Sequence, residues 1–244
     1  MTHETDVTHE PGVTDDLAAH EAAAARADRR RVWLPVLGVL LVGVLVAAGV
    51  GYLLRGAAST PVDDGPEAGF ARDMQVHHAQ AVEMSLIVRE KTADPTLRAM
   101  AYDVITSQQQ QIGQMYAWLN QWGLSQTSSR APMAWMSTMD HTGMAGMSPG
   151  PESMTLLPDG RMPGMASADE IARLRAADGR AAEIQWLQLM IPHHQAGVMM
   201  ADAVIQKSSE PHVVKLANAI RTAQRAEIDQ MRQMLTERGA GEKT

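Results

Sequence analysis

The chain has 244 residues, a length that fits one or two domains. Its net charge of −7 argues against a nucleic acid partner, and the lack of cysteine excludes disulfides and thiolate metal sites. Methionine is abundant, with 18 residues against a single phenylalanine. Because a thioether is both a flexible core filler and a soft metal ligand, packing and metal binding are the two explanations to separate.

The N-terminal part predicts a membrane anchor. Residues 1–31 lack an apolar stripe and are predicted to form a disordered cytoplasmic tail. Residues 32–54 carry no charge over 23 positions, enough for a helix to cross a bilayer core of about 30 Å. Arg29, Arg30 and Arg31 come directly before them, and such a run of positive charge tends to stay in the cytoplasm. We therefore expect a single-pass protein of the cell membrane whose main domain is extracytoplasmic. Residues 55–66 follow as a linker. A cleaved signal peptide is the alternative.

The rest of the chain contains an internal repeat. A shift of 116 residues places residues 70–123 on residues 186–239 without a gap, and more than a quarter of the aligned positions are identical. Equal spacing over this length indicates duplication. The identical positions include two adjacent histidines in each copy: His77, His78, His193 and His194.

Each copy is predicted to form two helices joined by a short turn. Apolar residues recur at three- and four-residue steps, Pro95 suits the first turn of a second helix, and Gly123 suits its end. A domain over residues 67–239 would then be all-α, with two helical hairpins packed as a four-helix bundle. Its expected parts are copy one at 67–123, a Met-rich spacer at 124–166, a short helix at 168–177 and copy two at 180–239.

The paired histidines are expected in the interior of the bundle. Counting from the turns, His77 lies level with Gln111, and His193 lies level with Glu227. Unpaired polar groups in an apolar seam cost about 1–3 kcal/mol each. Two explanations remain open, a layer of hydrogen bonds from His to Gln and Glu, or a metal ion held by neutral imidazoles. The same helix faces carry two further amides, Gln108 and Gln224.

Methionines flank these histidines. Four-helix di-iron proteins place Glu three residues before a ligating His, and here Met74 and Met190 take that position. Imidazole and thioether without thiolate favour copper over iron, as Cu(I) first, with Cu(II) where a carboxylate contributes. We also expect the spacer methionines to be exposed and able to collect Cu(I). The candidate metal ligands are His77, His78, Met74, Met84, His193, His194, Met190, Met200 and Glu227.

Three segments resemble a known bacterial family, domain of unknown function 305: "FARDMQVHHAQAVEMS", "LQLMIPHHQAGVMMA" and "AQRAEIDQMRQML". The resemblance extends over residues 67–239. It implies a ferritin-like four-helix fold, often secreted or membrane-anchored, with some members linked to copper binding and tolerance. It also implies a role for the paired histidines and their methionines, whereas Gln111 stands where the family commonly has Glu.

Three functions follow as hypotheses. The first is a non-enzymatic copper-binding protein that sequesters the ion or hands it to copper-handling partner proteins. The second is a ferritin-like metal-dependent oxidase, which needs carboxylate ligands that only Glu227 and Glu83 could supply. The third is a helical interaction domain without metal. A homodimer built from hairpins of two chains stays open.

Overall fold

The computed structural model describes residues 38–51, 60–136 and 156–242 of the chain. It divides into two compact units, Met1–Ser59 and Thr60–Thr244, each described by itself.

In the first unit, residues 38–51 form a helix whose side chains are all exposed. Of the helices described, none is both long and apolar enough to span a bilayer. The predicted tail, both ends of the predicted anchor at 32–37 and 52–54, and the start of the linker lie outside the described residues. The membrane anchor therefore stays a prediction.

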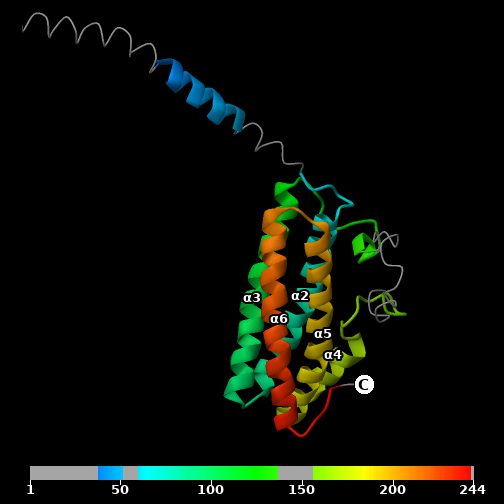
Figure 1. Ribbon diagram of the computed structural model, residues 1–244. Helices are drawn as coiled ribbons and strands as arrows, with labels where there is room; N and C mark the ends of the chain where they lie inside the picture. Colours follow the sequence, from blue (N-terminus) through cyan, green and yellow to red (C-terminus); the bar gives the residue numbers. More distant parts are fainter. Residues whose placement is uncertain (1–37, 52–59, 137–155, 243–244) are drawn as a thin grey trace, which may run out of the picture. The chain divides into compact units, whose positions relative to one another are not determined.

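The second unit is helical throughout the part that the structure describes. Figure 1 shows its four long helices, α2, α3, α5 and α6, running side by side as a bundle. Helix α2 packs against α3 and α5, and α5 packs against α6. The element bounds are α2 Pro66–Lys91, α3 Pro95–Gln121, η1 Ala134–Met136, α4 Ala168–Ala176, α5 Gly179–Lys207 and α6 Pro211–Glu237.

The helix ends follow local signals in the sequence. Pro95 and Pro211 begin α3 and α6, and the Asp94 side chain accepts a hydrogen bond of 2.8 Å from the backbone N–H of Thr96. Proline suits this position because the first helical N–H has no partner within the helix. Past the end of α3, Gly123 takes a left-handed φ of +71°. Helix α6 starts and ends 116 residues after α3 does, and α5 ends 116 residues after α2 does.

Helix α4, the short helix that the sequence predicts, begins with a capping box. The Ser167 hydroxyl accepts a hydrogen bond from the backbone N–H of Glu170, and the Glu170 carboxylate accepts one from the backbone N–H of Ser167. Such a cap satisfies two backbone donors that the first turn would otherwise leave unpaired. It allows a helix of only nine residues to form between the spacer and α5.

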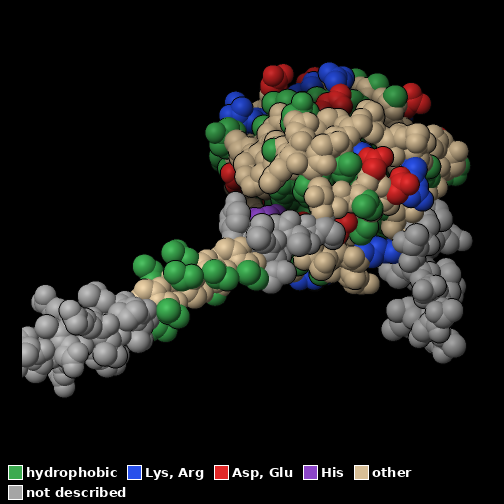
Figure 2. Space-filling model, turned by 90° about the horizontal axis from the view of Figure 1, so that it is seen from above, with side chains coloured by type: hydrophobic (Ala, Val, Ile, Leu, Met, Phe, Trp, Pro, Cys, Tyr) green, Lys and Arg blue, Asp and Glu red, His purple; other side chains and the backbone are tan. Residues whose placement is uncertain are grey.

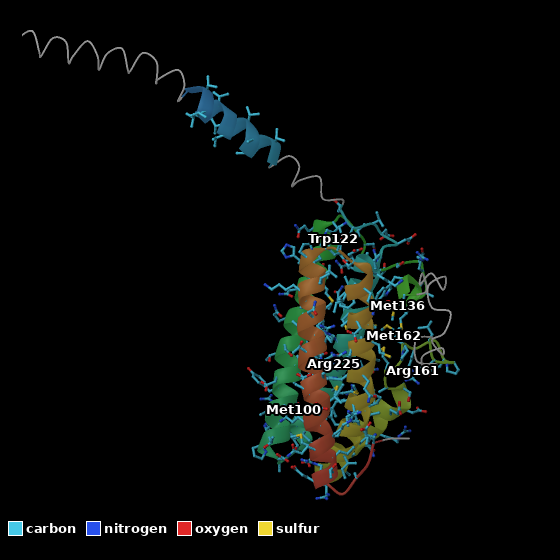
Figure 3. The ribbon with its side chains drawn as sticks, in the orientation of Figure 1. Met100, Trp122, Met136, Arg161, Met162 and Arg225 are labelled. Carbon is cyan, nitrogen blue, oxygen red and sulfur yellow. The ribbon has the colours of Figure 1, made fainter. Side chains whose placement is uncertain are left out.

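The spacer packs more closely than we expected from its composition. The expectation of exposed spacer methionines is wrong for Met133, Met136 and Met162, which are buried in the core. Figure 3 shows Met136 and Met162 beside α5. The cause is an aromatic anchor, since Trp135 meets Phe70 edge to face at 6.1 Å and buries the chain on both sides of it. Residues 137–155, with the remaining part of the Met-rich segment, lie outside the described residues.

Polar contacts hold this anchor in place. The Asp73 carboxylate on α2 accepts hydrogen bonds from the Trp135 indole N–H at 2.8 Å and from the backbone N–H of Met133 at 2.7 Å. Gly69 leaves the space that the indole occupies, because a Cβ there would lie 2.3 Å from Trp135 Cδ1. The spacer is therefore part of the folded unit at its N-terminal end.

The outer surface of the helical unit carries charges of both signs. Figure 2, which views the molecule from above, shows acidic and basic side chains interspersed over the visible face. Several of them form ion pairs, among them Arg225 with Asp202 at 2.9 Å. Mixed surface charge of this kind is typical of a solvated exterior and contributes little to stability.

Candidate metal centre

The two histidine pairs meet where α2 packs against α5. The rings of His77 and His193 stack with their centroids 3.7 Å apart and their planes inclined by 29°. All four histidines are completely buried. The sequence predicts one polar layer in each hairpin, whereas in the structure the two layers join into a single one. We call His77, His78, His193 and His194 the histidine layer.

The outer histidine of each pair makes a hydrogen bond to the partner helix of its own hairpin. His78 Nε2 lies 2.7 Å from Gln111 Oε1, and His194 Nε2 lies 2.7 Å from Glu227 Oε2. Residue spacing from the turns predicts His77 and His193 level with these two partners, one residue away from the observed contacts. The difference arises because His77 and His193 turn toward each other across the contact of α2 with α5.

Most of the other polar atoms in the layer have no partner. Within the described residues, both ring nitrogens of His77 and His193 and the Nδ1 atoms of His78 and His194 are buried without a hydrogen bond of normal geometry. The side-chain amides of Gln108 and Gln224 are unpaired in the same way. Native interiors pair nearly all such groups, so this concentration is unusual, and these atoms could serve as ligands to an ion or bond to a bridging water.

Burial keeps His77, His78 and His193 uncharged. It lowers the pKa of His77 and of His193 well below the usual range, and the neighbouring imidazoles add to that effect. For His78, burial lowers the pKa to about 3, while the hydrogen bond to Gln111 opposes the shift. These imidazoles are neutral at physiological pH, and neutral imidazole is the form that binds metal ions.

The methionines on the histidine face divide between two buried clusters. Met74 and Met200 belong to the cluster that contains Phe70, whereas Met84 and Met190 belong to the cluster that contains Trp186. Each cluster thus receives one methionine from each copy, and all four side chains are at most 1% exposed. The structure brings the predicted thioethers into the core next to the same helix faces without gathering all four at one point.

The acidic candidates lie further out. The Glu227 side chain is 22% exposed and contacts His194. Glu83 lies at the surface, where its carboxylate pairs with Arg175 at 2.5 Å. Across the described ranges, no three His, Asp or Glu side chains are arranged to hold a metal ion among them.

The loop that contains Pro163 and Gly164 packs over the stacked pair of histidines. The sequence gives no sign that this loop belongs to the site. The backbone carbonyl of Pro163 acts on His77 strongly enough to oppose the fall of its pKa, after burial and the neighbouring histidines. Gly164 packs so tightly on α5 that a Cβ there would lie 2.4 Å from the Pro192 carbonyl oxygen and 3.0 Å from His193 Cα. Its φ of +75° is a left-handed conformation that glycine adopts readily.

Gln80 fastens the end of this loop. Its amide donates to the backbone carbonyl of Ala166 at 2.9 Å and accepts from the backbone N–H of Ala166 at 2.7 Å. Gln80 lies three residues after His77 on α2, so the loop is held within one helical turn of the stacked pair. No motif in the sequence distinguishes Gln80 from the other glutamines.

The fold and this centre define a class: helical bundles with a buried layer of histidines between methionine-bearing cores. The family model of the domain of unknown function DUF305 matches residues 67–235. The chain therefore belongs to the DUF305 family. No curated protein matches it.

Several solved structures share the fold. A DUF305 protein from Streptomyces coelicolor, assigned as secreted, is 40% identical, with a TM-score of 0.65 over 75% of this chain and 99% of that one. A DUF305 fragment from Deinococcus radiodurans is 31% identical, with a TM-score of 0.54 over 70% and 96%. CopM in its Cu(II)-bound form is 28% identical, with a TM-score of 0.50 over 71% and 97%.

Proposed function

We propose that this protein is an extracytoplasmic copper-binding protein of the DUF305 family, which sequesters copper or hands it on. The observation that carries the proposal is the histidine layer. Six of its ring nitrogens are buried between two cores that contain thioethers and make no hydrogen bond of normal geometry to any described residue. Neutral imidazole and thioether are ligands for copper, and Cu(I) in particular accepts both. The Cu(II)-bound form of the related CopM supports copper as the ion.

The proposed ligands are the four histidines, with thioethers chosen among Met74, Met84, Met190 and Met200. Ion binding between His77 and His193 would require local rearrangement, since their rings stack face to face. Binding would satisfy ring nitrogens that are otherwise buried without partners, and that gain offsets the cost of separating the rings. The ferritin-like duplication of two hairpins is part of this proposal, and the 116-residue offset of the helix ends supports it.

The extracytoplasmic location rests on two different observations. The apolar segment 32–54 follows three consecutive arginines at 29–31, and the relative from Streptomyces coelicolor is assigned as secreted. We propose the segment as the anchor of the domain. Protease accessibility of the domain in intact spheroplasts, compared with lysed ones, tests the location, and protection in intact spheroplasts would contradict it.

Copper content of the full chain tests the function. The protein is purified without chelator and titrated with Cu(I) against a competing chelator, with His77→Ala/His193→Ala as the test variant and His212→Ala as the control. His212 lies exposed at the start of α6. We expect a fixed copper stoichiometry in the wild type and the control, and its loss in the double variant. Equal copper uptake by both variants would contradict the proposed site.

The metal-free interaction domain is the second candidate, and the hydrogen bonds of His78 and His194 favour it. It predicts the same thermal stability with and without copper, whereas a ligand bound by the folded state alone raises stability. Thermal unfolding at increasing copper concentration therefore separates the two candidates. An oxidase has weaker support, because Glu83 pairs with Arg175 at the surface and Glu227 is left as its only acidic candidate.

A further inference from the structure

The contact between His194 and Glu227 determines which ring nitrogen can bind an ion. His194 Nε2 lies 2.7 Å from Glu227 Oε2. An ionised carboxylate can only accept a hydrogen bond, so Nε2 carries the proton and donates it. The form of His194 that binds a metal ion is the neutral imidazole, which has one N–H; with that proton on Nε2, the lone pair is on Nδ1. That Nδ1 atom is buried and makes no hydrogen bond to any described residue.

The first copy repeats this arrangement with an amide. Gln111 Oε1 faces His78 Nε2 at 2.7 Å, and the amide oxygen accepts in the same way. The Nδ1 atom of His78 is again buried and unpaired within the described part of the chain. Both outer histidines thus hold their Nε2 atoms toward a partner helix and leave Nδ1 free.

We propose that Glu227 and Gln111 are positioning residues, which keep the protons of His194 and His78 on Nε2 and present the two Nδ1 atoms as copper ligands. This inference rests on the proposed function and deepens it. It gives Glu227 an orienting role in place of the direct coordination that the sequence suggested. Partial exposure of the Glu227 side chain, at 22% against complete burial of His194, agrees with a place outside the histidine layer.

The two positioning residues differ in charge, and this makes the two histidines unequal. A carboxylate that accepts from the distal N–H of an imidazole raises the basicity of the other nitrogen more than an amide does. His194 is therefore the stronger donor to a copper ion, and His78 is the weaker one. The repeat provides matched variants, because Glu227→Gln makes both acceptors amides and Gln111→Glu makes both carboxylates.

The proton positions can be measured in the metal-free protein. Long-range ¹H–¹⁵N correlation spectra of the full chain above pH 7 distinguish the two neutral histidine tautomers. We expect the Nε2–H form for His78 and His194 in the wild type and for His194 in Glu227→Gln. In Glu227→Ala, we expect His194 to lose its tautomer preference while His78 retains it. An Nδ1–H form of His194 in the wild type, or an unchanged tautomer in Glu227→Ala, would overturn the inference.

Copper affinity separates positioning from coordination. If Glu227 positions His194, Glu227→Gln retains the copper stoichiometry and binds less tightly, and Glu227→Ala is weaker again, by about 10- to 100-fold relative to the wild type. Gln111→Glu should bind more tightly. Equal weakening in Glu227→Gln and Glu227→Ala, with no effect of Gln111→Glu, would show direct coordination by the carboxylate. The tautomer spectra need no metal, so they test the positioning role even if the wild type binds no copper.

Discussion

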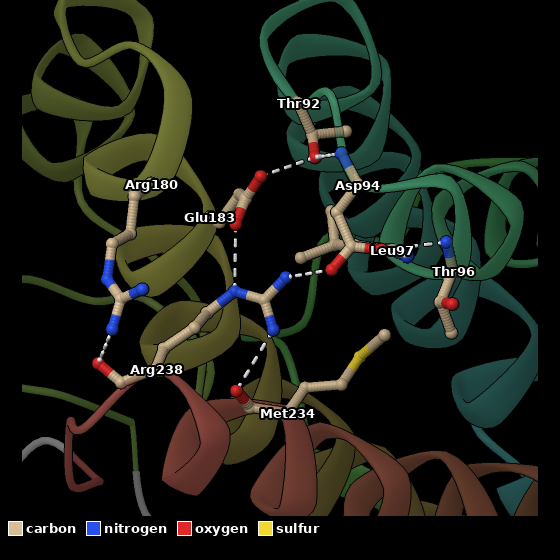
Figure 4. A network of polar contacts seen from close by, with 8 residues as sticks. All are labelled: Thr92, Asp94, Thr96, Leu97, Arg180, Glu183, Met234 and Arg238. Carbon is tan, nitrogen blue, oxygen red and sulfur yellow. Dashed lines mark hydrogen bonds and ion pairs between the residues drawn. The ribbon is translucent and has the colours of Figure 1, made fainter.

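Two groups of buried polar side chains in the helical unit face the same energetic problem and meet it differently. At one end of the bundle, the Arg238 guanidinium donates to Glu183 Oε2 at 2.8 Å and to Asp94, and Thr92 donates to Glu183 Oε1 at 2.6 Å (Figure 4). We call these four residues the arginine cluster. It joins the α2–α3 turn to the start of α5 and the end of α6, so it connects the two hairpins.

The arginine cluster satisfies its own charges, whereas the histidine layer does not satisfy its polar atoms. The remaining N–H groups of Arg238 include one that donates to the Met234 carbonyl at 3.0 Å. In the histidine layer, six ring nitrogens make no hydrogen bond of normal geometry to any described residue. A buried polar group without a partner costs about 1–3 kcal/mol, so a completed network stabilises a fold while an incomplete one implies a ligand. Burial of polar side chains alone therefore does not identify a functional site, whereas buried polar atoms that lack hydrogen-bond partners do.

Acid should produce the largest difference between the two groups. Below the ordinary histidine pKa of 6.5, the unfolded chain binds protons that the buried His77, His78 and His193 do not bind. The free energy of unfolding should then fall by about 1.4 kcal/mol per pH unit for each histidine that stays neutral. Urea unfolding of the metal-free protein between about pH 7.5 and pH 5 measures this slope.

The arginine cluster should respond to acid in a lower range. Burial raises the pKa of Asp94, but hydrogen bonds from the Leu97 and Thr96 backbones and from Arg238 outweigh it, so the net shift is downward. The stability that Asp94 contributes is present above its ordinary pKa of 3.8 and is lost as the pH falls through the lower folded value. For the histidine layer, a free energy of unfolding that stays constant down to pH 5 would contradict the burial of neutral histidines.

Removal of the arginine should be the next largest effect. Arg238→Met leaves the Glu183 carboxylate buried with no cation, which should lower the free energy of unfolding by about 3–5 kcal/mol. Arg180→Met is the matched control, because the exposed Arg180 makes one hydrogen bond, to the Arg238 carbonyl. Chemical denaturation of both variants measures the difference. A loss below about 1 kcal/mol in Arg238→Met would show that the cluster is no more than a surface ion pair.

The loop over the histidine layer should give an intermediate effect. Gly164→Ala introduces a Cβ at 2.4 Å from the Pro192 carbonyl in addition to a strained left-handed φ. Gly160→Ala has the same backbone strain with open space around it, and this strain alone costs about 1–2 kcal/mol. We expect Gly164→Ala to be the less stable variant in thermal unfolding. Equal stabilities would mean that the loop does not pack on α5 in solution.

The smallest effect should have the opposite sign. His77→Leu in the metal-free protein replaces two unpaired ring nitrogens by an apolar side chain, so it should leave stability unchanged or raise it by about 1 kcal/mol. No equivalent gain is expected in the arginine cluster, where truncation leaves a charge behind. Denaturation of the metal-free variant, alongside its copper affinity, checks both consequences. A large destabilisation would indicate that the layer is already satisfied, for instance by bound water.

Much of the local structure was predictable from short-range patterns. Pro95 and Pro211 mark helix starts, Ser167 with Glu170 marks α4, and Gly123 follows the end of α3, because each acts through bonds within a few residues. The burial of all four histidines was predicted from periodicity. The hairpin count placed Gln111 and Glu227 near the right level but beside the wrong histidine, because helix rotation depends on contacts between hairpins.

Other features depend on residues far apart in the sequence. Burial of Met133, Met136 and Met162 was mispredicted, since composition reports that a segment is rich in glycine and proline but not that Trp135 packs on Phe70. The arginine cluster escaped prediction for the same reason, because Arg238 and Asp94 are separated by 144 residues. Long-range contacts of this kind leave no periodic trace in a single sequence.

By itself, the sequence of this DUF305 protein determined its helices, their ends and the polar residues placed on apolar faces, because these follow from periodicity and capping within a few turns. Tertiary structure alone decided that His77 stacks on His193, that the Nε2 atoms of His78 and His194 lie 2.7 Å from Gln111 and Glu227, and that a loop lies over the layer. The physical reason is that the packing of α2 against α5 sets the rotation of each helix. That rotation selects which of two adjacent imidazoles faces the other hairpin and which faces its own.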